Sequence, residues 1–293
     1  MLQSRSLFSS RWRRAAFALF IVAAVIVAAT GAADRLGLRF LDGGMKRALV
    51  TFGISRTLNG VISVAQGTEV AIEPAGVGVK FAPGEILDPV NDLVERFSWV
   101  MLTASASLGL QKLLLELFEW TPVTLAYAAS GLVLLVLMLL HQHVAPVLLA
   151  FFVRLFVMLT IVRFMLPLLA LTAEAIHDGF LQARYDAAIV SLEQSGADIG
   201  KLNRQGLGAT EAEAPGGFLD TLGNLIGSAR SGFDLESRFQ QYRKVAGEVT
   251  TTSIELIVIF LFQTIVLPLA MLYLGKFLFT STMRMLRGFT ASA

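Results

Sequence analysis

Two arginines lie inside an apolar stretch, where an ionised side chain must have a partner or a route to water. Arg154 and Arg163 both fall within residues 147–171, a run long enough to cross a bilayer. Arg154 is near enough to one end of the run to extend its charge to lipid phosphates, whereas Arg163 lies too deep for that. We expect Arg163 to contact Gln263, which has a similar depth in the run 254–279. The contact would be a buried polar strut, or both side chains would face an aqueous path that favours anions.

The other chemically capable residues form no recognisable site. The chain has no cysteine and three histidines, which excludes disulfides, thiol catalysis and cysteine-ligated metals. His141 and His143 have no acid or third histidine nearby in sequence, so we predict a polar turn there rather than a metal site. His177 lies beside Glu174 and Asp178, and we expect it at a solvated helix end. Phosphate-loop, metalloprotease and nucleophile-elbow motifs are missing from the sequence. We predict no catalytic residue, metal or cofactor, and therefore no enzyme.

The composition indicates an integral membrane protein. Of the 293 residues, 55% are hydrophobic and 16% charged, whereas soluble domains average roughly 45–50% and about 25%. The mean hydropathy is +0.68, and the apolar residues are clustered in runs. A net charge of +2 is too small to suggest nucleic-acid binding. We therefore expect the chain to contact membrane lipid and not nucleic acid.

Four apolar runs are predicted to cross the membrane as helices: 15–33, 122–140, 147–171 and 254–279. Arginines in the basic N-terminus, 1–14, and in the C-terminus, 280–293, place both ends in the cytoplasm by the positive-inside rule. The long segments 34–96 and 172–253 then face outward. The topology predicts a multi-pass membrane protein, and the lack of cysteine together with the basic leader favours a bacterial inner (plasma) membrane.

Two further segments, 48–66 and 97–118, are apolar enough to touch the membrane. The second contains Lys112 and Glu116, and each ionised group at the centre of a span costs about 2.5–3.5 kcal/mol on insertion scales. We therefore prefer four spans, with 97–118 as an interfacial or partly inserted amphipathic helix, to the alternative of six. Both alternatives leave the two termini on the same side.

The outward segments have patterns of their own. Alternating residues at 69–73 and 77–81, joined by Pro74-Ala-Gly76, predict a small β-hairpin. A helix is expected to start at Pro89, capped by Asp88, and to run through Phe118. One stripe of this helix is apolar: Leu102, Ala106, Leu110, Leu113 and Leu117.

Heptad spacing in the second outward segment predicts an antiparallel coiled-coil hairpin, whose tip would be residues 205–217. The outgoing helix and the returning helix each contribute a row of apolar residues, together called the seam: Leu181, Tyr185, Leu192, Ile199, and then Leu235, Phe239, Tyr242. We prefer packing of the two arms within one chain to packing between subunits. The fold class expected is all-α, with four (alternatively six) transmembrane helices, this hairpin and the small β-hairpin.

These features lead to two functional hypotheses. The first is a self-associating inner-membrane protein, a homo-oligomer that forms a pore or conduit beneath an extracytoplasmic helical collar. It is suggested by the buried arginines and by the apolar stripe, which would be adhesive if exposed. The second is a non-conducting scaffold or accessory subunit that holds a second envelope protein.

Overall fold

The computed structural model describes residues 11–67, 70–72, 79–81, 83–140, 145–208 and 218–290. Within these ranges the side chains of 11–13, 70–72, 79–81, 83–84, 205–208, 218–236 and 285–290 are not described. The described chain is almost entirely helical. Its helices, in chain order, are α1 (Arg11–Thr30), α2 (Ala32–Gln66), α3 (Pro83–Glu119), α4 (Thr121–Leu139), α5 (Pro146–Ile176), η1 (His177–Leu181), α6 (Gln182–Gly208), α7 (Phe218–Leu261), η2 (Phe262–Val266) and α8 (Leu267–Thr290).

Several helices are long and apolar enough to cross a membrane. Among the described residues there are five, within Ala32–Gln66, Glu85–Glu119, Thr121–Leu139, Pro146–Arg204 and Ser237–Arg284, and the apolar helix Arg14–Thr30 is shorter. Large apolar side chains remain exposed on several of them, for example Leu125 on α4 and Leu269 on α8. Exposed apolar surface on such helices is the surface that lipid covers. This architecture is compatible with a multi-pass membrane protein.

The chain divides into two compact units. Unit 1 comprises Met1–Met45, Ala106–Gly179 and Phe262–Ala293, and unit 2 comprises Lys46–Ser105 and Phe180–Leu261. The chain passes from one unit to the other within α2, α3 and η1 and at the junction of α7 with η2. The segments η1 and η2 are π-helical, so the chain stays helical from α5 through η1 into α6, and from α7 through η2 into α8.

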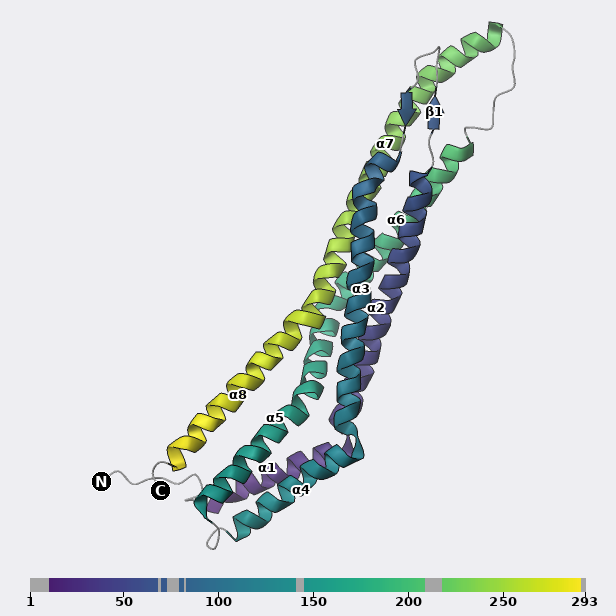
Figure 1. The fold of residues 1–293 in the computed structure, drawn as a ribbon. Coiled ribbons are helices and arrows are strands. Elements are labelled where there is room, and N and C mark those ends of the chain that lie inside the picture. The colour runs from purple at the N-terminus through teal and green to yellow at the C-terminus, as the bar shows by residue number, and fades with distance from the viewer. Residues whose placement is uncertain are drawn as a thin grey trace. The chain divides into compact units, whose positions relative to one another are not determined.

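Unit 1 has an aromatic and aliphatic core between α1, α4 and α5. Phe156 and Ile21 are fully buried there, and the ring of Tyr127 stacks on Phe156 with centroids 5.3 Å apart. Figure 1 shows α1 lying alongside α4. Gly131 allows this close approach, because a Cβ at that position would lie 2.9 Å from Val25 and 3.1 Å from Phe156.

Unit 2 is organised around α6 and α7, which lie side by side (Figure 1). The hydroxyls of Ser191 and Thr252 are 3.2 Å apart across this contact. Tyr185 of α6 makes contacts on two sides: its ring lies edge-on to Phe260 of α7, and its hydroxyl is 3.3 Å from that of Thr51 on α2. Helix α6 therefore packs against both α7 and α2.

The seam residues whose side chains are described lie on the inner side of unit 2. Phe239 is half-buried, whereas five others are buried: Leu181, Tyr185, Leu192, Ile199 and Tyr242. The side chain of Leu235 and the expected hairpin tip at 209–217 lie outside the described residues. The burial of these side chains arises within one chain.

Two short strands, β1 (Val70–Ile72) and β2 (Val79–Phe81), pair antiparallel with Val70 opposite Phe81. The turn expected between them, 73–78, lies outside the described residues. The start predicted for the following helix was wrong: α3 begins at Pro83, and Pro89 lies inside it. Asp88 is consequently not a cap, and its carboxylate accepts a hydrogen bond from Gln66 Nε2 at 2.6 Å.

Candidate functional site

A buried ion pair is the most distinctive polar feature of unit 1. The two terminal nitrogens of Arg163 on α5 donate to the two carboxylate oxygens of Asp34 on α2, at 2.7 and 2.6 Å. The side chains are only 3% and 1% exposed. This two-pronged geometry is the strong form of the arginine–carboxylate contact, since both hydrogen bonds are charge-assisted and parallel.

The turn between α1 and α2 positions Asp34. Helix α1 ends at Thr30, and Gly31 takes φ +60°, a left-handed conformation in which glycine carries no steric penalty. Arg35 donates to the carbonyl of Thr30 at 2.7 Å and ties the two helices together across the turn. Asp34 thereby falls in the first turn of α2, where the helix dipole favours a carboxylate.

A close contact of α2 with α5 and α3 lies one turn further along. A Cβ at Gly37 would be 2.9 Å from Leu115 of α3 and 3.3 Å from Ala170 of α5. Pro167 lies beside the same glycine and is one helical turn after Arg163, and its ring nitrogen cannot donate to the carbonyl of Arg163. The helices that hold the ion pair are therefore in backbone-level contact.

Gln263 has a different partner from the one expected. Its amide nitrogen lies 3.1 Å from Nδ1 of His177, and both side chains are buried. In this arrangement the amide of Gln263 donates and Nδ1 of His177 accepts. The expected strut between Arg163 and Gln263 is thus wrong: across the described residues, each has its own partner on another helix. The solvated position expected for His177 is wrong as well, since it is 3% exposed.

His177 and Gln263 both belong to π-helical turns. His177 begins η1 and Gln263 is the second residue of η2, which Pro268 follows closely. A π-turn inserts an extra residue into a helix and rotates the side chains that follow, and such turns are frequent at functional positions. Here the two irregular turns bring a buried histidine and a buried amide together.

Two further polar contacts complete the description of unit 1. The hydroxyls of Tyr127 on α4 and Thr160 on α5 are 3.0 Å apart. Lys112 of α3 donates to Asp42 of α2 at 2.7 Å, and both of these side chains are partly exposed. Several polar groups that belong to the apolar helices are therefore matched to one another.

Arg154 is half-buried, and its Nε is a buried nitrogen without a hydrogen-bond partner in the described part of the chain. Its expected extension toward lipid phosphate stays a prediction. His141 and His143 lie outside the described residues. Within the described ranges, no group of three or more histidine, aspartate or glutamate side chains is arranged to hold a metal ion.

Sequence reasoning missed Asp34 and misplaced His177. A signal for Asp34 was present: it is the first acidic residue of the chain and directly follows the first apolar run, at the end toward which Arg163 is displaced. No local pattern points to His177, because its neighbours Glu174 and Asp178 are those of an exposed turn.

The arrangement has a clear chemical consequence. The guanidinium of Arg163 is neutralised by Asp34 and closed off from solvent, so in this conformation it presents no net charge to a passing ion.

No protein-family model, characterised protein or solved structure matches the chain.

Proposed function

We propose that the protein is a non-conducting membrane scaffold or accessory subunit of an envelope complex. The observation that carries this proposal is the closed Asp34–Arg163 pair. An arginine that attracts anions through a pore has to face the aqueous path, whereas Arg163 has both terminal nitrogens on one carboxylate and is 3% exposed. The pair instead stabilises the packing of α2 against α5.

Four membrane crossings, with both termini in the cytoplasm, form the topology that we propose. The packing of unit 2 supports it, because α2 lies along α6 from Thr51, near Tyr185, to Val61, near Gly200. Exposed charged side chains line α6 at this level, namely Glu193, Asp198 and Lys201. If residues 48–66 crossed the bilayer, this part of α6 would have to lie in it as well, at several kcal/mol for each charge.

In this topology residues 34–96 and 172–253 face outward, so they are the part of the chain available to a partner. Helix α6 and most of α7 lie in these outward segments, and they form the two arms of the predicted coiled-coil hairpin. The strands β1 and β2 are on the outer side of the membrane as well. A long pair of packed helices on the outer side of the membrane offers an extended surface to another envelope protein.

A bilayer recording combined with affinity purification tests the proposal. We expect purified protein in planar bilayers to stay silent across voltage and tension, and gently extracted protein to retain a different envelope protein in stoichiometric amount. Ion currents through the wild type, with a different ion selectivity in Arg163→Met, would refute the scaffold hypothesis and favour the pore hypothesis.

A second function, the self-associating pore or conduit, is favoured by one surface. The apolar stripe of α3 is exposed along the helix, with Leu110 and Leu113 59% and 63% exposed and the small Ala106 between two larger neighbours. Apolar stripes with a small residue suit close helix–helix contact. Mass measurement in detergent for the wild type and Leu110→Lys decides between lipid and a second copy as the cover of this stripe. A multimer that dissociates in the variant supports self-association, and a wild-type monomer contradicts it.

A further inference from the structure

We propose that unit 2 contains a binding groove for a single-chain anionic lipid, a long-chain fatty acid, between α2 and α6. The acyl chain would lie along the groove and the carboxylate would bind Arg204. This inference is independent of whether the protein is a scaffold or a pore, because it rests only on the packing of α2 against α6.

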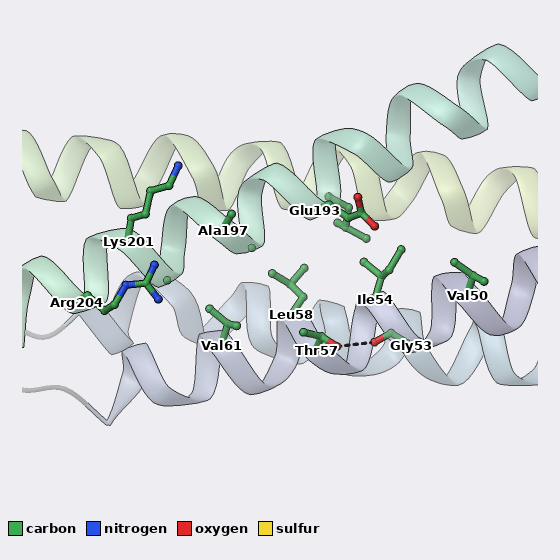
Figure 2. A pocket seen from close by; sticks show the side chains of 13 residues that line it. Val50, Gly53, Ile54, Thr57, Leu58, Val61, Glu193, Ala197, Lys201 and Arg204 are labelled. Carbon is green, nitrogen blue, oxygen red and sulfur yellow. Dashed lines mark hydrogen bonds between the residues drawn. The ribbon is translucent and has the colours of Figure 1, made fainter.

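The groove is a hollow of about 680 Å³. Figure 2 shows four aliphatic residues of α2 along it, Val50, Ile54, Leu58 and Val61. Leu192 of α6 also lines it. The hydroxyl of Thr57 is turned to the carbonyl of Gly53 at 3.0 Å, so the remaining polar groups of the lining are the charged side chains of Glu193, Lys201 and Arg204. The volume falls in the range of small-molecule sites, roughly 300–1,000 Å³.

Glycines create the space. A Cβ at Gly53 would have no atom within 4 Å, so this position is open to the hollow. Gly196 and Gly200 on α6 allow Leu58 and Val61 to approach to 3.5 and 4.0 Å of their Cβ positions. The glycine pair of α6 is therefore already used for contact with α2, and the free volume lies beside that contact.

The charges of the groove are asymmetric. Figure 2 shows Lys201 and Arg204 at one end, beyond Val61. A terminal nitrogen of Arg204 lies 4.0 Å from the Cβ position of Gly200, which places the guanidinium over the groove. Lys201 is paired with Asp198 at 3.0 Å, whereas Arg204 has no acidic partner in the described part of the chain. Glu193 lies two helical turns before Lys201, so an anionic group is repelled there and attracted to the Arg204 end.

This pattern matches a ligand that is apolar along its length with one negative charge at its end. The aliphatic part extends from Val50 to Val61, about 16 Å at 1.5 Å per residue, comparable with an extended fatty acyl chain. A second helix fits poorly, because a cylinder about 10 Å wide and 16 Å long occupies more than about 1,000 Å³. A guanidinium also matches a carboxylate geometrically, with two parallel hydrogen bonds.

Photolabelling of the full-length protein in phosphatidylcholine nanodiscs tests the inference. The probe is palmitate with a diazirine in its chain, the labelled peptides are mapped by mass spectrometry, and unlabelled palmitate and hexadecanol compete. We expect labels on the α2 and α6 peptides of the groove, and palmitate to compete at least about fivefold better than hexadecanol, the factor for roughly 1 kcal/mol per basic residue near an anionic lipid.

Two variants and two matched controls sharpen the test. Gly53→Leu fills the hollow without a clash at Cβ and raises helix propensity, so it should fold and lose groove labelling at least tenfold. Gly247→Leu is its control, because Gly247 is an equally open glycine on α7. Arg204→Gln should abolish the preference for palmitate over hexadecanol and leave hexadecanol competition unchanged. Lys244→Gln, which removes a positive charge from exposed α7, should behave as the wild type.

Labelling that is spread over lipid-facing helices, equal competition by hexadecanol, or undiminished groove labelling in Gly53→Leu would overturn the inference. Stronger competition by phosphatidylglycerol than by palmitate would also overturn it, because it would assign the groove to a phospholipid. None of these outcomes bears on conductance or on a protein partner, so the proposed function stands or fails separately.

Discussion

Substitution of either Asp34 or Arg163 should destabilise the protein more than substitution of any exposed charged residue. Both side chains are at most 3% exposed and share two hydrogen bonds, so removal of one leaves the other charged, buried and unpaired. Such losses amount to about 3–5 kcal/mol. At roughly 2 °C or more per kcal/mol for a chain of this size, the midpoint of thermal unfolding should fall by at least about 6 °C.

The two single variants should differ in a defined order. In Arg163→Met the remaining group is the carboxylate of Asp34 in the first turn of α2, where the helix dipole stabilises a negative charge. In Asp34→Leu the remaining guanidinium cannot lose its proton under any physiological condition. Asp34→Leu should therefore be the more damaging of the two.

The double variant separates the removal of a charge from the loss of a contact. Asp34→Leu with Arg163→Met replaces the ion pair by apolar groups of similar volume, which is often neutral or stabilising. We expect the double variant to recover most of the stability that either single variant loses. Tryptophan fluorescence during heating in a mild detergent measures all three variants, and Lys244→Met, which breaks an exposed pair, is the control with a loss of at most about 1 kcal/mol.

Two results would refute this reasoning. Single variants that unfold within about 1 °C of the wild type would show that Asp34 and Arg163 are hydrated or unpaired in the folded protein. A double variant as unstable as Asp34→Leu would show that the hydrogen bonds themselves, rather than an unpaired charge, account for the loss.

Three further predictions follow from the packing and the topology. Gly131→Ala places a Cβ 2.9 Å from Val25 and should destabilise the protein by about 1–3 kcal/mol in the same melting assay, whereas Gly247→Ala should not; equal melting would contradict the close approach of α1 and α4. Gln263→Leu removes the contact with His177 and should lower the free energy of unfolding by about 0.6 kcal/mol, at most ~1.7, the range for hydrogen bonds between membrane helices. A loss as large as that of Asp34→Leu would contradict this expectation. Because the chain has no cysteine, a single introduced cysteine reports topology without background. With a membrane-impermeant maleimide, Glu85→Cys and Gln194→Cys should react from outside and Arg284→Cys from the cytoplasm. Reaction of Glu85→Cys from the cytoplasm would establish six spans instead of four.

Periodicity and hydropathy were sufficient for three of the apolar helices. Apolar runs of about 20 residues can satisfy their backbone in lipid only as helices, so 122–139, 147–171 and 254–279 are helical in the structure. The bounds of the run 15–33 were wrong, because α1 ends at Thr30 and the chain turns at Gly31 before α2. The heptad positions of α6 are buried because a 3.5-residue repeat keeps one side of a helix apolar whatever partner covers it. The pattern identified the buried side but not α2 as an additional helix against it.

The partners of the polar side chains were decided by tertiary structure alone. Arg163 and Asp34 are 129 residues apart, and Gln263 and His177 are 86 apart. A single sequence shows that Arg163 and Gln263 are costly in an apolar helix, since that cost depends only on the residue type and its surroundings in the helix. Which group relieves the cost depends on the rotation of each helix, and rotation is set by close contacts such as Gly37 against α3 and α5 and by the π-turns, which local patterns do not encode.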